Sequence, residues 1–196
     1  MEARRIAEEQ GYKREEGYAL NNIGDIYKYQ RRYDEARKFV SLAIGIFENL
    51  HDSAGLYYCH IRLGEIAQSL SEYPRALQSF RQALTYSYVF GDKVWQAGAL
   101  NRIGQVYQLQ GLYAEALGAF FPALAISTAA LNDEDEKAFI LVQIGKAYLA
   151  RQQQDSALHY LHRGFDLAER IGLKQHLREA SKTLAEIYTA KRDYAV

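Results

Sequence analysis

The chain has 196 residues, and its hydrophobic fraction of 48% excludes an intrinsically disordered protein. Its 24 Lys and Arg residues balance its 24 Asp and Glu residues, so the net charge gives no electrostatic reason to expect nucleic acid or an anionic membrane as a partner. The single cysteine allows no internal disulfide, and no apolar run approaches the roughly 20 residues that a membrane span needs.

An internal repeat runs along the chain. The motif LNNIGDIYKYQRRYDEA, which begins at Leu20, recurs as HIRLGEIAQSLSEYPRA, LNRIGQVYQLQGLYAEA and LVQIGKAYLARQQQDSA, and a fifth copy reads ASKTLAEIYTAKRDYAV. A small residue recurs at the same place in the motif, as glycine at Gly24, Gly64, Gly104 and Gly145 and as alanine at Ala185, in steps of 40, 40, 41 and 40 residues. Regular steps of this length are typical of arrays of small supersecondary units.

Each copy predicts two helices joined by a short polar turn. The first helix has apolar residues at helical spacing, as at Leu20, Ile23 and Tyr27. The second alternates small and large residues, as at Ala36 and Val40, which is expected where helix backbones approach closely and gaps must be filled. In chain order we predict the tail of a preceding second helix at 1–12, repeats at 17–52, 53–92, 93–132 and 133–173, and a partial repeat at 174–196.

The two prolines have different predicted effects. Pro74 suits the first turn of the second helix in its repeat. Pro122 falls inside a second helix, where the loss of one backbone hydrogen bond predicts a bend. Both ends of the chain cut through repeats without a visible capping element, so we expect a piece of a longer protein, and the uncovered apolar ends would allow a homodimer.

The motif resembles that of the tetratricopeptide repeat (TPR) family, in a longer form of about 40 residues rather than about 34. The four glycines match the small residue of the family's first helix. The aromatic residue of the family's first helix is matched by Tyr27, Tyr107, Tyr148 and Tyr188, whereas the second repeat has Ala67 there. The aromatic residue of the family's turn is matched by Tyr33, Tyr73, Tyr113 and Tyr194, whereas the fourth repeat has Gln154. The alanine of the family's second helix is matched by Ala36, Ala76, Ala116 and Ala157. The family's terminal proline is missing in every copy.

The resemblance implies an all-α fold, a right-handed superhelical solenoid of antiparallel helix hairpins with about four full repeats and half repeats at both ends. We assign the matched tyrosines to packing, since an aromatic stripe at helical spacing is usually core. The family's first helices line a concave groove, which is where a partner segment would bind. By that pattern the groove residues are Tyr18, Asn21, Asp25, Lys28, Tyr58, Ile61, Glu65, Gln68, Gly98, Asn101, Gln105, Gln108, Phe139, Val142, Lys146, Leu149, Glu179, Lys182 and Glu186.

These residue types suit a peptide ligand, because amides both donate and accept hydrogen bonds and aromatic side chains can anchor apolar groups. The alternatives are ordinary solvated groove residues or a partner on the convex face. The family's clamp for the carboxylate tails of heat-shock proteins is not expected, because Asp25 and Glu65 would repel a carboxylate.

Enzymatic and metal sites are not indicated. The chain has no glycine-rich phosphate loop, and we expect no catalytic residue, no cofactor and no metal. His159 and His162 would share a helix face, but only Asp155 and Asp166 are close by, so a surface histidine pair is predicted. Cys59 is predicted to be buried or half-buried. The acidic run 133–136 would complement a helix dipole.

Two further groups bear on the choice of partner. Arg31, Arg32, Arg37 and Lys38 cluster near the first hairpin, but Asp34 and Glu35 interleave with them, which favours a solvated face of mixed charge over nucleic-acid binding. The charged start of the chain is not a signal peptide, so we expect a cytoplasmic protein, with the periplasm left open should an upstream segment be missing.

We therefore predict a protein- or peptide-binding scaffold that is not an enzyme and binds neither nucleic acid nor a membrane. Forty-residue repeats with LNNIG-type motifs resemble the sensory or regulatory arrays of larger bacterial signalling proteins, and that context is the first reading. The alternative is a stand-alone receptor for a short signalling peptide. A metal-dependent or catalytic protein is the third reading.

Overall fold

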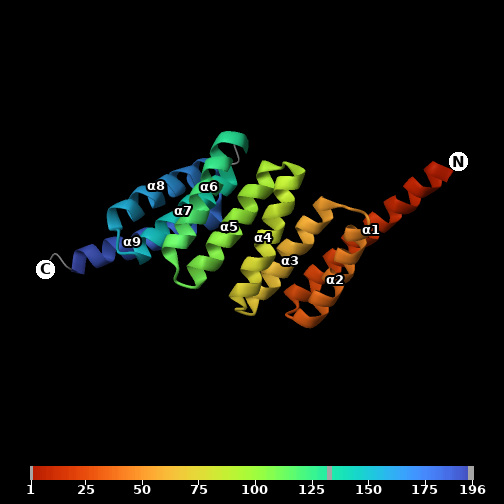
Figure 1. Cartoon of the computed structure of the whole chain (residues 1–196). Coiled ribbons are helices and arrows are strands. Elements are labelled where there is room, and N and C mark those ends of the chain that lie inside the picture. Colours follow the sequence, from red (N-terminus) through yellow and green to blue (C-terminus); the bar gives the residue numbers. More distant parts are fainter. Residues whose placement is uncertain (1, 132–133, 194–196) are drawn as a thin grey trace. The chain divides into compact units, whose positions relative to one another are not determined.

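The computed structural model describes the backbone of residues 2–131 and 134–193 and the side chains of 9–129 and 134–189. The described residues form nine α-helices and one π-helical turn, with no strand among them (Figure 1). They divide into two compact units, Met1–Asp92 and Lys93–Val196, which are described separately below as unit 1 and unit 2.

Unit 1 consists of two helical hairpins, the first of α1 (Glu2–Tyr29) and α2 (Tyr33–Asn49), the second of α3 (Ser53–Ser69) and α4 (Tyr73–Phe90). Asp52 caps α3 because its Oδ1 accepts hydrogen bonds from the backbone N–H groups of Ala54 and Gly55, both at 3.0 Å. Pro74 lies in the first turn of α4, as predicted.

The start of α1 corrects one expected boundary. The sequence predicted a separate helix tail at 1–12 before the first repeat, but residues 2–29 form one continuous helix. The joining segment contains good helix formers such as Glu9, Gln10 and Lys13, and neither a proline nor a residue with positive φ interrupts it. Nothing in this segment therefore turns the chain before the first repeat.

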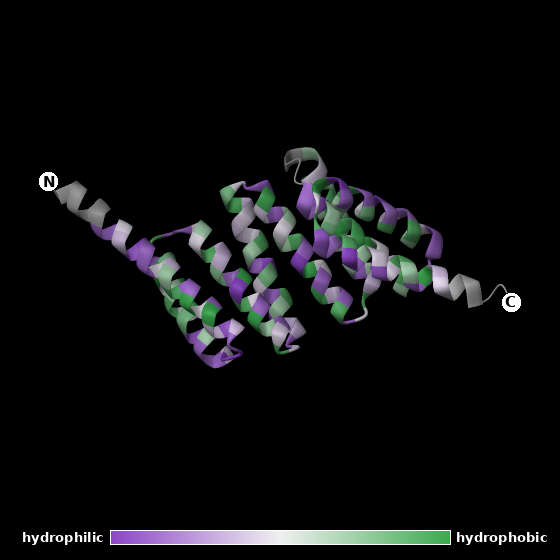
Figure 2. Ribbon diagram, turned by 180° about the vertical axis from the view of Figure 1, so that it is seen from behind, coloured by the Kyte–Doolittle hydropathy of each residue, from purple (hydrophilic) through white to green (hydrophobic). Residues whose placement is uncertain are grey.

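Unit 2 consists of α5 (Lys93–Leu109), α6 (Tyr113–Ile126), the π-helical turn η1 (Ser127–Leu131), α7 (Glu134–Ala150), α8 (Gln154–Ile171) and α9 (Lys174–Asp193). Helices α5 and α6 pack as one hairpin and α7 and α8 as another, and α9 packs on α8 and α7. Figure 2 shows hydrophobic and hydrophilic residues alternating along single helices, as expected when one side of each helix is buried.

Each motif glycine packs against a larger side chain 16 residues later, in the second helix of its own hairpin. The pairs are Gly24 with Val40, Gly64 with Phe80, Gly104 with Phe120 and Gly145 with Leu161. A Cβ atom added at Gly64 would lie 2.4 Å from Phe80 Cε1, which is too close for any real contact. The glycine is therefore required by the close approach of the two helices, as the alternation of small and large residues predicted.

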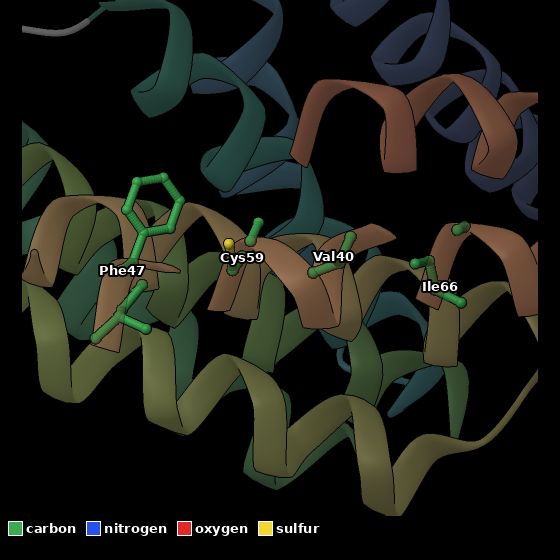
Figure 3. Close-up of a cluster of buried hydrophobic side chains, with 7 residues drawn as sticks. Val40, Phe47, Cys59 and Ile66 are labelled. Carbon is green, nitrogen blue, oxygen red and sulfur yellow. The ribbon is translucent and has the colours of Figure 1, made fainter. Parts of the chain in front are cut away.

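The core of unit 1 contains Val40, Phe47, Cys59 and Ile66, each with no exposed surface (Figure 3). Burial raises the pKa of the Cys59 thiol to about 12, so the thiol is neutral at physiological pH. The predicted burial of this cysteine is confirmed.

Equivalent turns differ in how easily they adopt a left-handed backbone. The turn between the two helices of a hairpin has a residue with positive φ in every case: 60° at Arg31, 58° at Ser71, 75° at Gly111 and 61° at Gln152. Only Gly111 adopts this conformation without steric cost, because it has no Cβ atom. The three other hairpins hold a side chain in a region that L-residues disfavour.

Pro122 lies inside α6, which ends at Ile126 and passes directly into η1. The missing N–H group of the proline leaves the carbonyl of residue 118 without its usual helical partner. The structure thus places an irregular helical turn close to the proline, and the bend inferred from the sequence stays a prediction. Within the described residues, no helix has the combination of length and apolar character needed to cross a membrane.

Candidate ligand-binding face

Four charged side chains on α1 and α3 form a closed network, called here the charge cluster: Asp25, Lys28, Arg62 and Glu65. Lys28 Nζ lies 2.7 Å from Glu65 Oε2, and Arg62 Nη1 lies 2.7 Å from the same oxygen. Asp25 Oδ1 is 2.5 Å from Arg62 Nη1 and 3.0 Å from Lys28 Nζ, distances of ion pairs without good hydrogen-bond geometry. The side chains are only 13–25% exposed, and their charges sum to zero.

The charge cluster corrects a premise of the sequence argument. Asp25 and Glu65 were treated as free negative charges that would repel a carboxylate, but both are paired with cations. The cluster also contains a polar atom without a hydrogen bond, since Arg62 Nε is buried without an acceptor among the described residues. On the same helix as Asp25, the buried Oδ1 of Asn21 likewise has no donor.

Two predicted aromatic residues lie beside each other on the same two helices. The rings of Tyr18 and Tyr58 meet edge to face with centroids 6.4 Å apart, and Tyr18 packs on Phe47 at 4.9 Å. Burial raises the pKa of Tyr18, with Asp52 adding to the effect. Tyr58 is 42% exposed, so it is the aromatic side chain of this face that offers surface to a ligand.

Unit 2 has an open pocket of about 330 Å³ on the corresponding side of its first helices. Four of the predicted groove residues line this pocket: Gly98, Asn101, Gln105 and Phe139. Its remaining lining residues were not among the predicted site residues, and they are Arg102, Asp135, Glu136 and His176. They come from α5, α7 and α9, so the pocket collects residues from three helices.

A chain of hydrogen bonds orients the polar groups of the pocket. Gln105 Nε2 donates to Asn101 Oδ1 at 3.3 Å, and Asn101 Nδ2 donates to Glu136 Oε1 at 2.7 Å. Asn101 is only 5% exposed, so it acts mainly by holding Gln105 and Glu136 in place. The amide of Gln105 keeps donor and acceptor capacity beyond this one bond.

The other side of the pocket joins an imidazole, an aromatic ring and a carboxylate. His176 Nε2 lies 3.0 Å from Asp135 Oδ1, and the rings of His176 and Phe139 are tilted with centroids 5.3 Å apart. His176 Nδ1 is buried and has no partner among the described residues. The Asp135 side chain is 64% exposed, so its carboxylate remains accessible to a ligand.

The other predicted groove residues have varied surroundings. Val142 is fully buried and Ile61 is 7% exposed, so neither offers a surface for direct contact. Lys146 Nζ is 2.5 Å from Glu179 Oε1. Gln68, Gln108 and Leu149 are half-buried, and Lys182 and Glu186 are exposed on α9.

Sequence reasoning missed Arg62 and Arg102, although a signal was present. They lie 40 residues apart at the same place in the motif, next to a predicted groove position. Asp135 and Glu136 were interpreted only as acids that complement the start of a helix, where they do lie in the first turn of α7. Residue 133 of that acidic run, like the turn residue Tyr194, falls outside the described residues.

The histidine pair on α8 is engaged with neighbouring side chains. His162 Nε2 is 3.0 Å from the Tyr188 hydroxyl, and His159 Nε2 is 3.4 Å from Arg163 Nη1. In the part of the chain that the structure describes, no group of three His, Cys, Asp or Glu residues is placed to hold a metal ion.

Comparison with known proteins gives one family. The family model described as tetratricopeptide repeat matches residues 15–87 and 95–170. The resemblance inferred from the glycine and tyrosine positions is thereby confirmed.

Solved structures show the same fold at low identity. Aspartyl phosphate phosphatase F from Bacillus subtilis is 18% identical, with a TM-score of 0.80 over 93% of this chain and 52% of that one. A Rap protein complexed with Competence and Sporulation Factor is 18% identical, with a TM-score of 0.77 over 85% of this chain and 46% of that one. A STAND signal-transduction ATPase with a tetratricopeptide repeat sensor from Pyrococcus horikoshii is 15% identical, with a TM-score of 0.79 over 86% and 26%.

These similarities confirm the predicted all-α fold of TPR-like helical hairpins. The chain spans about half the length of the first two of these proteins and about a quarter of the third.

Proposed function

Because the chain belongs to the tetratricopeptide repeat family, we propose that it is a scaffold that binds a protein or peptide segment, and that the segment contacts the pocket of unit 2. The observation that carries this proposal is the pocket itself, in which four groove residues expected from the repeat lie beside further polar groups from α5, α7 and α9. The charge cluster, by contrast, leaves the corresponding residues of unit 1 paired with one another.

The chemistry of the pocket suits a peptide. The Gln105 amide can donate to a peptide carbonyl and accept from a peptide N–H, and Phe139 offers an aromatic surface beside it. Asp135 would favour a cationic group of the ligand, since its carboxylate is exposed at the edge. A lining of this mixed kind contributes mainly by fixing the orientation of the ligand, and less through the apolar area that binding buries.

The setting we propose is the sensory or regulatory region of a larger bacterial signalling protein. One supporting observation is the similarity to the STAND ATPase, in which the tetratricopeptide repeats form a sensor. The second candidate is a receptor for a short signalling peptide, which is favoured by the similarity to a Rap protein solved with Competence and Sporulation Factor. At 15–18% identity these similarities establish the fold alone, so both settings remain proposals.

The test begins with a random peptide display library selected on the full chain, followed by fluorescence polarisation with the selected peptides. The variants Gln105→Ala and Asp135→Asn each remove one accessible pocket group without touching the buried core. We expect each to weaken binding by about tenfold, the usual effect of losing one good hydrogen bond or ion pair.

The matched control is Gln110→Ala, which removes an exposed glutamine side chain directly after the same helix. It should leave the affinity unchanged within about twofold. Peptides that bind both pocket variants as tightly as wild type, but lose affinity with Tyr58→Ala, would refute the pocket of unit 2 and move the site to unit 1.

A further inference from the structure

A second pocket, of about 370 Å³, lies in unit 1 between α2, α3 and α4. Its lining consists of two arginines, one histidine, three neutral polar residues and two apolar residues: Arg37, Arg75, His60, Gln78, Ser79, Gln82, Leu63 and Ala67. None of these residues belongs to the predicted groove, and no carboxylate is among them. The pocket is therefore separate from the candidate ligand-binding face, and its chemistry is different.

The two arginines share a single carboxylate. Glu72, which precedes α4, accepts a hydrogen bond at its Oε2 from Arg37 Nη2, and Arg75 Nη1 lies 3.1 Å from the same oxygen. Desolvation opposes ionisation of Glu72, but the hydrogen bonds from Arg75 and Arg37 outweigh it and lower its pKa. The three side chains together therefore carry one surplus positive charge, and each guanidinium retains further N–H donors.

The histidine does not change this charge at neutral pH. His60 is partly buried and stacks on Tyr86, with ring centroids 5.5 Å apart and an interplanar angle of 19°. Burial lowers its pKa, which keeps the imidazole neutral near pH 7. The surplus charge therefore comes from the two arginines alone and persists over the whole neutral range.

The rest of the lining is suited to an organic group attached to an anion. Leu63 and Ala67 supply an apolar wall from α3, while Gln78 and Gln82 are exposed amides on α4. A bare inorganic anion would leave the apolar wall unused. A planar carboxylate matches the fork of a guanidinium and can be held by two parallel N–H groups.

We propose that this pocket binds an organic carboxylate, with the carboxylate against Arg37 and Arg75 and its apolar part against Leu63 and Ala67. The proposal goes beyond the peptide-binding role of unit 2 and does not depend on it, because the two pockets share no residue. The carboxylate could be that of a small metabolite or the C-terminus of a peptide. The two sources present the same chemistry to the arginines.

The test is a titration of the full chain followed by nuclear magnetic resonance. The probes are N-acetyl-L-leucine, its neutral amide N-acetyl-L-leucinamide, inorganic phosphate, and the peptide acid N-acetyl-Ala-Ala-Leu. We expect N-acetyl-L-leucine to shift the signals of the His60 ring and the Gln78 amide, the amide probe to bind at least about tenfold more weakly, and phosphate to bind more weakly than the carboxylate. Tighter binding of the peptide acid would identify a peptide C-terminus as the source, and equal binding would identify a small carboxylate.

The variants Arg37→Gln and Arg75→Gln should each weaken N-acetyl-L-leucine by about tenfold or more. Lys38→Gln is the matched control, because it removes one exposed positive charge next to Arg37 without altering the lining. Gln78→Ala leaves the ion pairs of Arg37 and Arg75 with Glu72 intact, so it keeps the test decisive should an arginine variant unfold, and it should also weaken binding. Equal affinity for the acid and the amide, unchanged affinity in the pocket variants, or phosphate as tight as the carboxylate would overturn the proposal.

Discussion

Units 1 and 2 use the same repeat framework but differ in what they do with one face of it. Asp25 and Glu65 in unit 1 correspond by the 40-residue step to Gln105 in unit 2. In unit 1 the carboxylates at these positions form ion pairs within the charge cluster, whereas in unit 2 the glutamine lines an open pocket. The positions that pack the hairpin are the same in both units.

The comparison separates residues that build a repeat from residues that give it a role. Gly64 and Phe80 in unit 1 make the same close contact as Gly104 and Phe120 in unit 2. Nothing in that contact depends on the groove residues, so the face is free to differ between the units.

The largest effect is expected where the framework is overfilled. In Gly64→Ala and Gly104→Ala the new methyl group would lie 2.4 Å from Phe80 or 2.5 Å from Phe120, rings with no room to withdraw because they are fully buried. Overpacking of this kind costs about 1–3 kcal/mol, so both variants should lose about 2 kcal/mol in urea unfolding despite the better helix propensity of alanine.

The control for this pair is Gly118→Ala, where an added Cβ meets nothing within 4 Å. It should be as stable as wild type or more stable, by up to about 1 kcal/mol. A large loss in only one of the two framework variants would show that the units do not share the same packing.

The next largest effect concerns the charge cluster. Arg62→Ala removes one of the two cations that each contact both carboxylates, and it leaves only Lys28 to balance them. Because these groups are largely buried, we expect a loss of about 1.5–2 kcal/mol in the free energy of unfolding, between the values for exposed and fully buried pairs.

Arg170→Ala in unit 2 provides the comparison, since Arg170 pairs with Glu134 at the surface, where the side chains are 64% and 36% exposed. Its loss should cost less than about 0.5 kcal/mol. Both values come from the same denaturation experiments in low salt, and equal costs would contradict the distinction between a closed and an exposed network.

A smaller effect, with opposite signs in the two units, is expected at the hairpin turns. Ser71→Gly in unit 1 should stabilise the protein by about 0.5–1 kcal/mol, because a side chain at φ 58° is disfavoured. Gly111→Ala in unit 2 should destabilise it by about 1 kcal/mol for the same reason, at φ 75°. The shift in melting temperature measures the stability change of each variant. Shifts of the same sign would show that the left-handed backbone at these turns does not determine the stability change.

The smallest effect is a pH dependence in unit 2. Desolvation opposes ionisation of Glu179, but the hydrogen bond and charge of Lys146 outweigh it, so its pKa is lowered on folding. A lowered pKa stabilises the fold above the unfolded value near 4.5, and this stability is lost as the pH falls through the folded pKa.

Glu179→Gln should therefore cost stability at pH 7, by less than about 1 kcal/mol since the pair is about one-third exposed, and it should cost less at pH 3. Lys146→Gln should show the same pH dependence, because it removes the other half of the interaction. A cost for Glu179→Gln that is equal at both pH values would exclude the ion pair as its source.

The framework could be predicted from the sequence because its signals are local and repeated. The glycine steps identified the helix pairs, and small residues indicated where helix backbones approach closely, whereas the pairing of Gly64 with Phe80 is known only from the structure. The continuity of α1 could not be predicted, since the repeat period places a boundary where the chain contains no proline, and the helix continues through Gly11 despite the low helix propensity of glycine.

The site was harder to predict because its residues are distant in sequence. His176 reaches the pocket from α9, and its contact with Asp135 spans 41 positions. A repeat motif describes positions within one repeat, so it cannot identify a contact partner that comes from another repeat. It also cannot distinguish Asn101, which lines the pocket, from Val142 at the equivalent position, which is buried by neighbouring helices.

Chemical labelling of the buried Cys59 thiol can report how often the core of unit 1 opens. A thiol-specific reagent attacks the thiolate, and a fully buried thiol with a pKa of about 12 supplies almost none while the core of unit 1 is closed. Since the sequence contains no second cysteine, each labelled molecule records an opening of unit 1 alone. Labelling rates with and without a bound ligand would therefore show whether the ligand stabilises unit 1 against opening, with no engineered probe in the protein.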